Sequence, residues 1–278
     1  MKKILVPVDF SKPSEYAAKM AAKIAEKTNA TVYLIHFIEL PSGVVDIGVS
    51  SRFSIPESML YLRKTKDKIL AFKKIFFSEE ITVEYFIKLS DPFEGIKKYA
   101  QKIDADLIIM GSKGHSKIDD IIIGSNTEKV VRSSKIPVII VKRNPKKFKL
   151  KNLVFASNFK KENQEAFGKF LDFANAFKSK VHLLQINTPS QFENTTDSKQ
   201  KIKKFIAPYE LPKFSINIYN DNSVEKGILN FSTEKKADLI ALSTHGRSGI
   251  SHLFMGSVAK NLSKKALKRK EEQKPHTH

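Results

Sequence analysis

The sequence predicts an α/β fold made of two tandem, doubly wound, mainly parallel open sheets. In the first 143 residues, short apolar segments alternate with amphipathic segments, which is typical of a parallel sheet between helix layers. Runs such as Leu107–Met110 and Val138–Val141 are apolar at every position, as expected of strands that are covered on both faces. The same order of segments then repeats in the second half of the chain, which indicates a duplicated domain.

Five strands are predicted in the first half because short runs rich in β-branched and aromatic residues are bounded there by turn residues or charges. They are Lys3–Val8, Thr31–Ile38, Val83–Ile87, Leu107–Met110 and Pro137–Val141.

Helices are predicted between these strands. Ser11 and Pro13 mark the start of the first helix, and its apolar residues recur at helical spacing. A loop from Pro41 to Pro56 leads into a long Lys-rich helix. The predicted helices after the first are Glu57–Phe77, Pro92–Ile103 and Asn126–Ser133.

The repeat defines the domain boundaries. The matching pairs are Ile4–Phe10 with Leu153–Phe159, Asp106–Ile108 with Asp238–Ile240, and Gly124-Ser125 with Gly256-Ser257. We therefore predict domains at residues 1–143 and 150–267, joined by Asn144–Leu150, and a charged tail at residues 268–278. The counterpart of Ile136–Val141 falls on Lys268–Gln273, which is charged or polar throughout. The second domain is therefore expected to lack the fifth strand.

Composition restricts the class of protein. The chain has 49 Lys and Arg against 29 Asp and Glu, a net charge of +20. Most of the basic residues are Lys and are scattered, and no aromatic-rich RNA-binding segment accompanies them, so we favour a solvated surface over a nucleic-acid footprint. The absence of Cys excludes disulfides, thiolate metal sites and cysteine nucleophiles. No run approaches the roughly 20 apolar residues that span a membrane, and we expect a cytoplasmic protein.

A glycine-rich loop follows the fourth predicted strand. Its pattern is G-x-x-G, nine residues and G-S, with Gly111, Gly114, Gly124 and Ser125 at the fixed positions. Glycine lets a ligand approach the backbone closely. The final Gly-Ser opens a helix, whose free N–H groups and positive dipole end suit a phosphate. Ser125 and Glu128 also match a capping box, so Ser125 has a structural role as well as a ligand role.

Other chemistries have little support. The Walker pattern of P-loop ATPases is absent, the His residues lack metal-ligand spacing, and no Ser has a His–acid pair near it in sequence. Asp119 and Asp120 lie inside the loop and could bind Mg²⁺ through water, but solvated charges are the simpler interpretation. The sequence therefore identifies no catalytic residue.

The quoted motifs resemble the universal stress protein family. The resemblance in the first half lies in Val6–Asp9, Asp106–Gly111, the G-x-x-G-x9-G-S loop and Ile136–Val141, and in the second half in Ser243–Arg247 and Phe254–Ser257. It covers nearly the whole chain and implies a strand order of 3-2-1-4-5 in each sheet.

In the ATP-binding branch of that family, matching residues have specific roles. Asp9 would accept from the adenine amino group, and the backbone near Ile38 would contact the base. The ribose and phosphates, often with Mg²⁺, would be held by Gly111, Gly114, Gly124, Ser125 and Asn126. Asp9 has an alternative role as a cap of the helix that follows.

The second half departs from this pattern. Asn158 stands where the first half has Asp9, and Ser243 replaces Gly111. The amide of Asn158 still offers an acceptor, whereas Ser243 adds a Cβ where the backbone of the loop should approach a ligand. We therefore expect the ATP site in the first half, and we leave ligand binding by the second half open.

Three functions remain. The first is an ATP-binding stress-response protein with little or no turnover. The second is a slow ATPase or self-phosphorylating enzyme that uses the same loop. The third is a nucleic-acid-associated protein that binds through the net charge of +20. If the loop binds no nucleotide, a non-nucleotide interaction scaffold is the alternative. The family resemblance also makes the apolar segment Ile136–Val141 a dimerisation element. Because the second half lacks its counterpart, we expect a homodimer through the first domains, as an exposed strand edge invites pairing.

Overall fold

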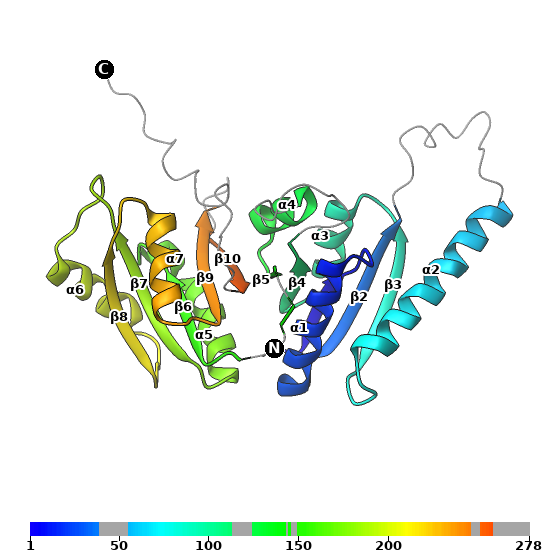
Figure 1. The fold of residues 1–278 in the computed structure, drawn as a ribbon, viewed down its shortest axis with the longest axis horizontal. Helices are drawn as coiled ribbons and strands as arrows, with labels where there is room; N and C mark the ends of the chain where they lie inside the picture. Colours follow the sequence, from blue (N-terminus) through cyan, green and yellow to red (C-terminus); the bar gives the residue numbers. More distant parts are fainter. Residues whose placement is uncertain (39–54, 113–123, 143, 146–148, 246–250, 258–278) are drawn as a thin grey trace, which may run out of the picture.

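The computed structural model describes residues 1–38, 55–112, 124–142, 144–145, 149–245 and 251–257. In this part of the chain a single ten-stranded sheet runs through both halves, in the order β3-β2-β1-β4-β5-β10-β9-β6-β7-β8 (Figure 1). Helices lie against both faces of the sheet, and the two halves stand side by side with β5 and β10 in the middle.

The first half has the predicted elements in the predicted order. They are β1 (Lys3–Pro7), α1 (Lys12–Thr28), β2 (Thr31–Ile38), α2 (Ile55–Phe76), β3 (Val83–Leu89), α3 (Pro92–Lys102), β4 (Leu107–Gly111), α4 (Ser125–Ser133) and β5 (Val138–Val141). All five strands are parallel and lie in the order 3-2-1-4-5. The fold class and the strand order are therefore confirmed.

The second half repeats the first four strands. Its elements are β6 (Asn152–Ala156), η1 (Lys161–Asn163), α5 (Gln164–Ala176), β7 (Lys180–Asn187), α6 (Thr195–Ile206), β8 (Phe214–Asn220), α7 (Val224–Glu234), β9 (Leu239–His245) and β10 (Ser251–Ser257). Strands β8-β7-β6-β9 are parallel neighbours. The described residues contain no parallel fifth strand in this half, as predicted, and Lys268–Gln273 lies outside them.

Strand β10 was not predicted, and it joins the two halves. It pairs antiparallel with β9 and parallel with β5, where Phe254, Met255 and Gly256 lie opposite Val138, Ile139 and Ile140. The expected homodimer through Ile136–Val141 rested on an exposed strand edge. That premise is wrong, because β5 has neighbours on both sides. A second copy could use β5 only if β10 left it.

The core consists of two apolar layers, one on each face of the sheet, and each layer draws residues from both halves. One layer contains Ile139 of β5 together with Phe155, Phe167 and Phe170 of the second half. These three Phe residues are fully buried, and burial of each side chain stabilises the fold by about 1.5–3 kcal/mol. The apolar contacts thus continue across the junction between the halves.

The same polar contact fixes the first strand of each half. The Asp106 carboxylate accepts from the backbone N–H groups of Lys2 and Lys3, at 2.5 and 2.9 Å. The Asp238 carboxylate accepts in the same way from Lys151 and Asn152, at 2.9 and 3.0 Å. Each Asp immediately precedes the fourth strand of its half, so its carboxylate ties that strand to the first strand, which is far away in sequence.

Candidate functional site at the carboxyl edge of the sheet

The carboxyl ends of three neighbouring strands form the candidate site in the first half. Strand β1 lies between β2 and β4 in the sheet, and adjacent strands are about 5 Å apart. The end of β2 at Ile38, the turn after β1 that contains Asp9, and Gly111 at the end of β4 are therefore neighbours. Open α/β sheets bind ligands at this edge.

Asp9 shapes the turn between β1 and α1. Its Oδ1 accepts from the backbone N–H of Ser11 at 3.0 Å and from the Ser11 hydroxyl at 2.6 Å. Ser11, and not Asp9, is the N-cap of α1, and its side chain accepts from the N–H of Ser14. Between them, Phe10 has a positive φ of 60°, a conformation that is uncommon for non-glycine residues. Asp9 therefore orients the cap rather than providing it, and its carboxylate is held at the edge of the sheet.

The end of β2 is buried and already has polar contacts. Ile38 is buried, and its carbonyl accepts from the N–H of Ser90 at 3.3 Å. Two residues earlier, His36 Nδ1 lies 2.7 Å from the Val8 carbonyl, and its ring lies 4.8 Å from the Phe10 ring. His36 thus connects β2 to the turn after β1, which no sequence motif indicated.

Gly111 has a packing role that the sequence did not show. A Cβ at this position would lie 2.5 Å from the backbone carbon of Pro13 and 2.7 Å from its carbonyl oxygen. The first turn of α1 therefore packs directly on the end of β4, and only glycine leaves room for it. The Gly111 carbonyl also accepts from the Thr127 hydroxyl of α4 at 3.2 Å. Gly111 thus holds both α1 and α4 against the end of β4.

Helix α4 begins where the glycine loop returns to β4. The N–H of Gly124 donates to the carbonyl of Ser112 at 2.7 Å, so the two ends of the loop meet. Gly124 is the N-cap of α4 and supplies no side-chain hydrogen bond. Ser125 is the first helical residue and is exposed, and Asn126 follows it. The first N–H groups of a helix have no acceptor within the helix, and such N-termini can bind anions.

The structure bears on the predicted capping box at the start of α4. The capping box of Ser125 and Glu128 is wrong, because the helix begins one residue earlier and Glu128 forms an ion pair with Arg132 at 2.6 Å. Gly114 lies outside the described residues. The remaining predicted site residues come from the ends of β1, β2 and β4 and from the first turn of α4.

In the second half, side chains hydrogen-bond to one another across the equivalent turn. Asn158 Oδ1 accepts from the N–H of Lys160 at 3.2 Å and from Asn163 Nδ2 at 2.7 Å. Asn163 is buried, and its Oδ1 accepts from the Ser243 hydroxyl. A short 3₁₀ turn, η1, replaces the start of the helix here. The Cβ of Ser243 is therefore accommodated, and its hydroxyl joins the end of β9 to this turn.

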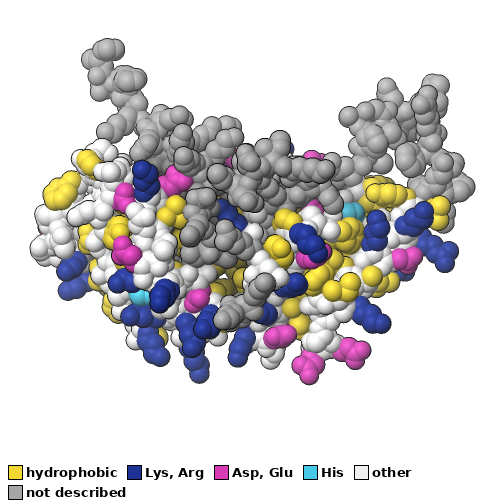
Figure 2. All heavy atoms as spheres, viewed as in Figure 1, with side chains coloured by type: hydrophobic (Ala, Val, Ile, Leu, Met, Phe, Trp, Pro, Cys, Tyr) yellow, Lys and Arg dark blue, Asp and Glu magenta, His cyan; other side chains and the backbone are white. Residues whose placement is uncertain are grey.

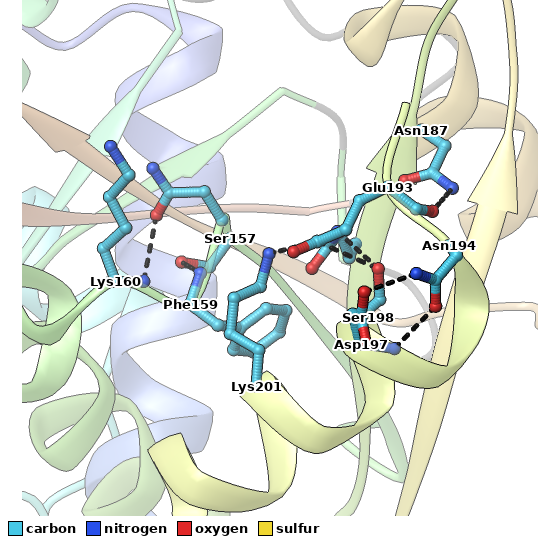
Figure 3. A network of polar contacts seen from close by, with 11 residues as sticks. Ser157, Phe159, Lys160, Asn187, Glu193, Asn194, Asp197, Ser198 and Lys201 are labelled. Carbon is cyan, nitrogen blue, oxygen red and sulfur yellow. Dashed lines mark hydrogen bonds and ion pairs between the residues drawn. The ribbon is translucent and has the colours of Figure 1, made fainter. Parts of the chain in front are cut away.

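A second polar cluster closes the end of β7. Glu193 Oε2 accepts from Gln185 Nε2 at 2.6 Å, from the Ser198 hydroxyl at 2.9 Å and from Lys201 Nζ. Its backbone carbonyl accepts from Asn187 Nδ2 at 2.9 Å. The hydrogen bond from Lys201, with that from Gln185, lowers the pKa of the Glu193 carboxyl. Figure 3 shows this cluster beside the turn that carries Ser157, Phe159 and Lys160.

This cluster was missed in the sequence, although a signal was present. Gln185 and Asn187 are alternate residues of β7, so they share one face of the strand. Both are buried, and their side-chain oxygens Gln185 Oε1 and Asn187 Oδ1 have no hydrogen-bond partner among the described residues. Two buried amides on one face of a strand predict a polar cluster, and Glu193 lies against them.

The described Lys and Arg side chains form no single cationic patch on the face drawn in Figure 2. On the face drawn in Figure 2, Lys and Arg side chains are spread over both halves, with Asp and Glu side chains among them. Within the described ranges there is no group of three or more His, Asp or Glu residues that could hold a metal ion. Among the same residues no helix is both long enough and apolar enough to cross a membrane.

Comparison with known proteins assigns the family. The model of the universal stress protein family matches residues 1–142 and again residues 149–268. Universal stress protein MJ0531 of Methanocaldococcus jannaschii is 32% identical over 148 residues, which cover 52% of this chain and 84% of that protein. Universal stress protein MJ0577 of the same organism is 32% identical over 154 residues, which cover 51% of this chain and 95% of that protein.

A solved structure supports the fold over both halves. A universal stress protein from Archaeoglobus fulgidus superposes with a TM-score of 0.71 and 18% sequence identity, over 92% of this chain and 97% of that one. At that identity the likeness concerns the fold alone. The two family matches and the identities above together show that this chain belongs to the universal stress protein family and contains two copies of its domain.

Proposed function

We propose that the chain binds ATP at the carboxyl edge of its first half and acts as a stress-response regulator with little or no turnover. The observation that carries this proposal is the start of α4, where Gly124 provides no side-chain cap and lies next to Ser112 at the end of β4. An uncapped helix N-terminus at the carboxyl edge of a parallel sheet favours a phosphate.

Each predicted site residue has a role in this proposal. Asp9 accepts from the adenine amino group, and the backbone at Ile38 contacts the base. Ribose and phosphates contact Gly111, Gly114, Gly124, Ser125 and Asn126. Any Mg²⁺ would be held chiefly by phosphate oxygens, since Mg²⁺ is commonly bound through one or two carboxylates plus substrate phosphates.

The domain boundaries are part of the proposal. We place the division at Asn144–Leu150, with domains at residues 1–143 and 150–267, and we assign the nucleotide to the first domain. The second half supports this assignment, because its segment equivalent to the start of α4 is strand β10 and its Ser243 hydroxyl donates to Asn163.

The experiment compares two matched double variants. The first, Asp9→Ala with Gly124→Val, changes the proposed site, and the second, Asn158→Ala with Gly256→Val, changes the equivalent positions of the second half. ATP binding is measured by calorimetric titration, and nucleotide released by denaturation is identified by mass. We expect one ATP per chain for the parent and the second variant, and at least about a hundredfold weaker binding for the first, since more than one contact is lost.

Other outcomes contradict the proposal in distinct ways. Equal ATP affinity in all three proteins would place the site elsewhere. Loss of binding only in the second variant would assign it to the second half. Steady phosphate release that disappears in the first variant would replace the regulator by a slow ATPase.

A further inference from the structure

Two equivalent segments of this chain have different secondary structures. Leu239 stands 132 residues after Leu107, and Gly256-Ser257 stands 132 residues after Gly124-Ser125 (239 − 107 = 256 − 124 = 132). In the first half Gly124 is the N-cap of α4 and Ser125 is its first residue. In the second half the same pair forms the last two residues of β10. The same Gly-Ser pair thus begins a helix in one half and ends a strand in the other.

Strand β10 has paired neighbours on both sides. All seven of its residues, Ser251–Ser257, are in register with β9, from His245 to Leu239. Three of them are also in register with Val138–Ile140 of β5. Backbone N–H groups that donate within a sheet are not available to an anion. Gly256 and Ser257 therefore cannot serve as an uncapped helix N-terminus in this conformation.

The rest of the equivalent edge is consistent with this change. Asn163 donates a hydrogen bond to the Asn158 side chain in the turn after β6. Its side-chain oxygen accepts from the Ser243 hydroxyl of β9. At the end of β7, the side chain of Asn187 donates to the backbone carbonyl of Glu193. At the carboxyl edge of the second half these side chains are therefore hydrogen-bonded to one another, whereas β10 continues the sheet toward the first half.

We propose that Ser251–Ser257 has exchanged a phosphate-binding role for a joining role. As β10 it makes the two halves one sheet and covers β5, and in this form the second half has no phosphate site. The two uses exclude each other, because a phosphate bound by the first turn of a helix at Gly256-Ser257 requires β10 to leave the sheet. The joining role stands on the strand pairing alone, and only the count of one nucleotide per chain rests on the proposed function.

Hydrogen exchange measured by mass spectrometry tests the proposal on the unmodified chain. We expect the segment Ser251–Ser257 to be protected like β9, and the segment around Gly124–Asn126 to exchange rapidly, because the first N–H groups of a helix lack acceptors. Added ATP should protect the segment around Gly124–Asn126 and leave Ser251–Ser257 unchanged. Rapid exchange of Ser251–Ser257 without ATP, or its protection only with ATP, would overturn the proposal.

A proline variant tests the joining role directly. Met255→Pro removes a backbone donor from a strand that is central in the sheet, where proline is not tolerated. We expect Val138–Val141 to exchange about tenfold faster or more, because β5 becomes an edge, while β1 and β2 keep their protection. Gln273→Pro, in the tail beyond β10, is the control. Unchanged protection of Val138–Val141 in Met255→Pro would refute the joining role.

The two tests fail separately. If the unmodified chain binds no ATP, the proposed function is wrong, but protection of Ser251–Ser257 and of Val138–Val141 still decides the joining role. If ATP binds at one per chain and Met255→Pro leaves β5 protected, the proposed function stands and the joining role does not. Binding of two ATP per chain would contradict the loss of the second phosphate site.

Discussion

The two halves of this chain share a fold and differ at the same edge of the sheet. In the first half, the end of β4 meets an uncapped helix at Gly124, and the backbone of Pro13 packs against Gly111. In the second half, Ser243 hydrogen-bonds to Asn163, and the segment equivalent to the helix start is a strand. The two copies of the domain therefore share their strand order, while the equivalent segment begins a helix in one copy and joins the sheet in the other.

The features that persist in both halves are those that hold strands together. Asp106 and Asp238 make the same contacts to the first strand of their halves, and Phe10 and Phe159 have nearly the same positive φ, 60° and 54°. Because the positive φ is present in both halves, the strained residue serves the fold in each of them. The φ of this residue therefore does not distinguish the two halves.

The largest effect is expected from the glycine at the end of β4. Gly111→Val would place side-chain atoms against the backbone of Pro13, so we expect a loss of about 3 kcal/mol, at the upper end for overpacked sites. Ser243→Ala, at the equivalent position, removes one hydrogen bond and should cost about 1 kcal/mol. Urea unfolding followed by circular dichroism measures both values. Equal losses would mean that the two strand ends are packed alike.

An exchange of the acidic and amide residues after the first strands should affect only one half. Asp9→Asn should weaken ATP binding about tenfold, because hydrogen bonds to a charged group contribute roughly 1.5–3 kcal/mol and an amide retains part of that. Asn158→Asp should create no second site, since the segment equivalent to the start of α4 is strand β10 in the second half. Calorimetric titration checks both variants, and a second ATP in Asn158→Asp would show that one side chain separates the two halves.

The Glu193 carboxylate, which accepts hydrogen bonds beside the end of β7, should stabilise the second half modestly. Glu193→Gln should lower the free energy of unfolding by about 1 kcal/mol, since the side chain accepts three hydrogen bonds but is about a third exposed and partly screened. Because the pKa of Glu193 is lowered from 4.5, its contribution is present above pH 4.5 and is lost as the pH falls below that value. Urea midpoints from pH 7 to pH 3 should converge for the two proteins at the acid end. If the urea midpoints of the two proteins differ by the same amount at every pH, the charge of Glu193 is not the cause of the difference in stability.

Burial of a histidine in the second half should make the free energy of unfolding decrease in acid, by less than the effects predicted above. Burial lowers the pKa of His182 from 6.5, helped by the charges of Lys180 and Lys235. The unfolded chain therefore binds a proton below pH 6.5 before the folded chain does, and stability falls there by at most about 1.4 kcal/mol per pH unit. The slope should disappear in His182→Gln, which keeps a polar partner for Ser215, whose hydroxyl lies 2.8 Å from His182 Nδ1. A slope that persists in that variant would assign it to other groups.

Local sequence determined most of this protein. Apolar runs predicted the strands of the first half, helix-start residues such as Ser11 and Pro13 predicted its first helix, and the internal repeat predicted a second copy of the domain. These signals suffice because strand and helix periodicity depend on neighbours in the chain. The site residues at the strand ends could be named for the same reason, since strand order places those ends at one edge of the sheet.

Only the tertiary structure decided the role of Ser251–Ser257 and the close packing at Gly111. Both depend on residues far away in sequence, β5 and β9 in one case and Pro13 in the other. A strand gains most of its stability from the strands beside it, so the same Gly-Ser pair can begin a helix in one half and end a strand in the other. The sequence by itself specifies two similar domains. Contacts between distant segments decide in which of them the Gly-Ser pair begins a helix and in which it ends a strand.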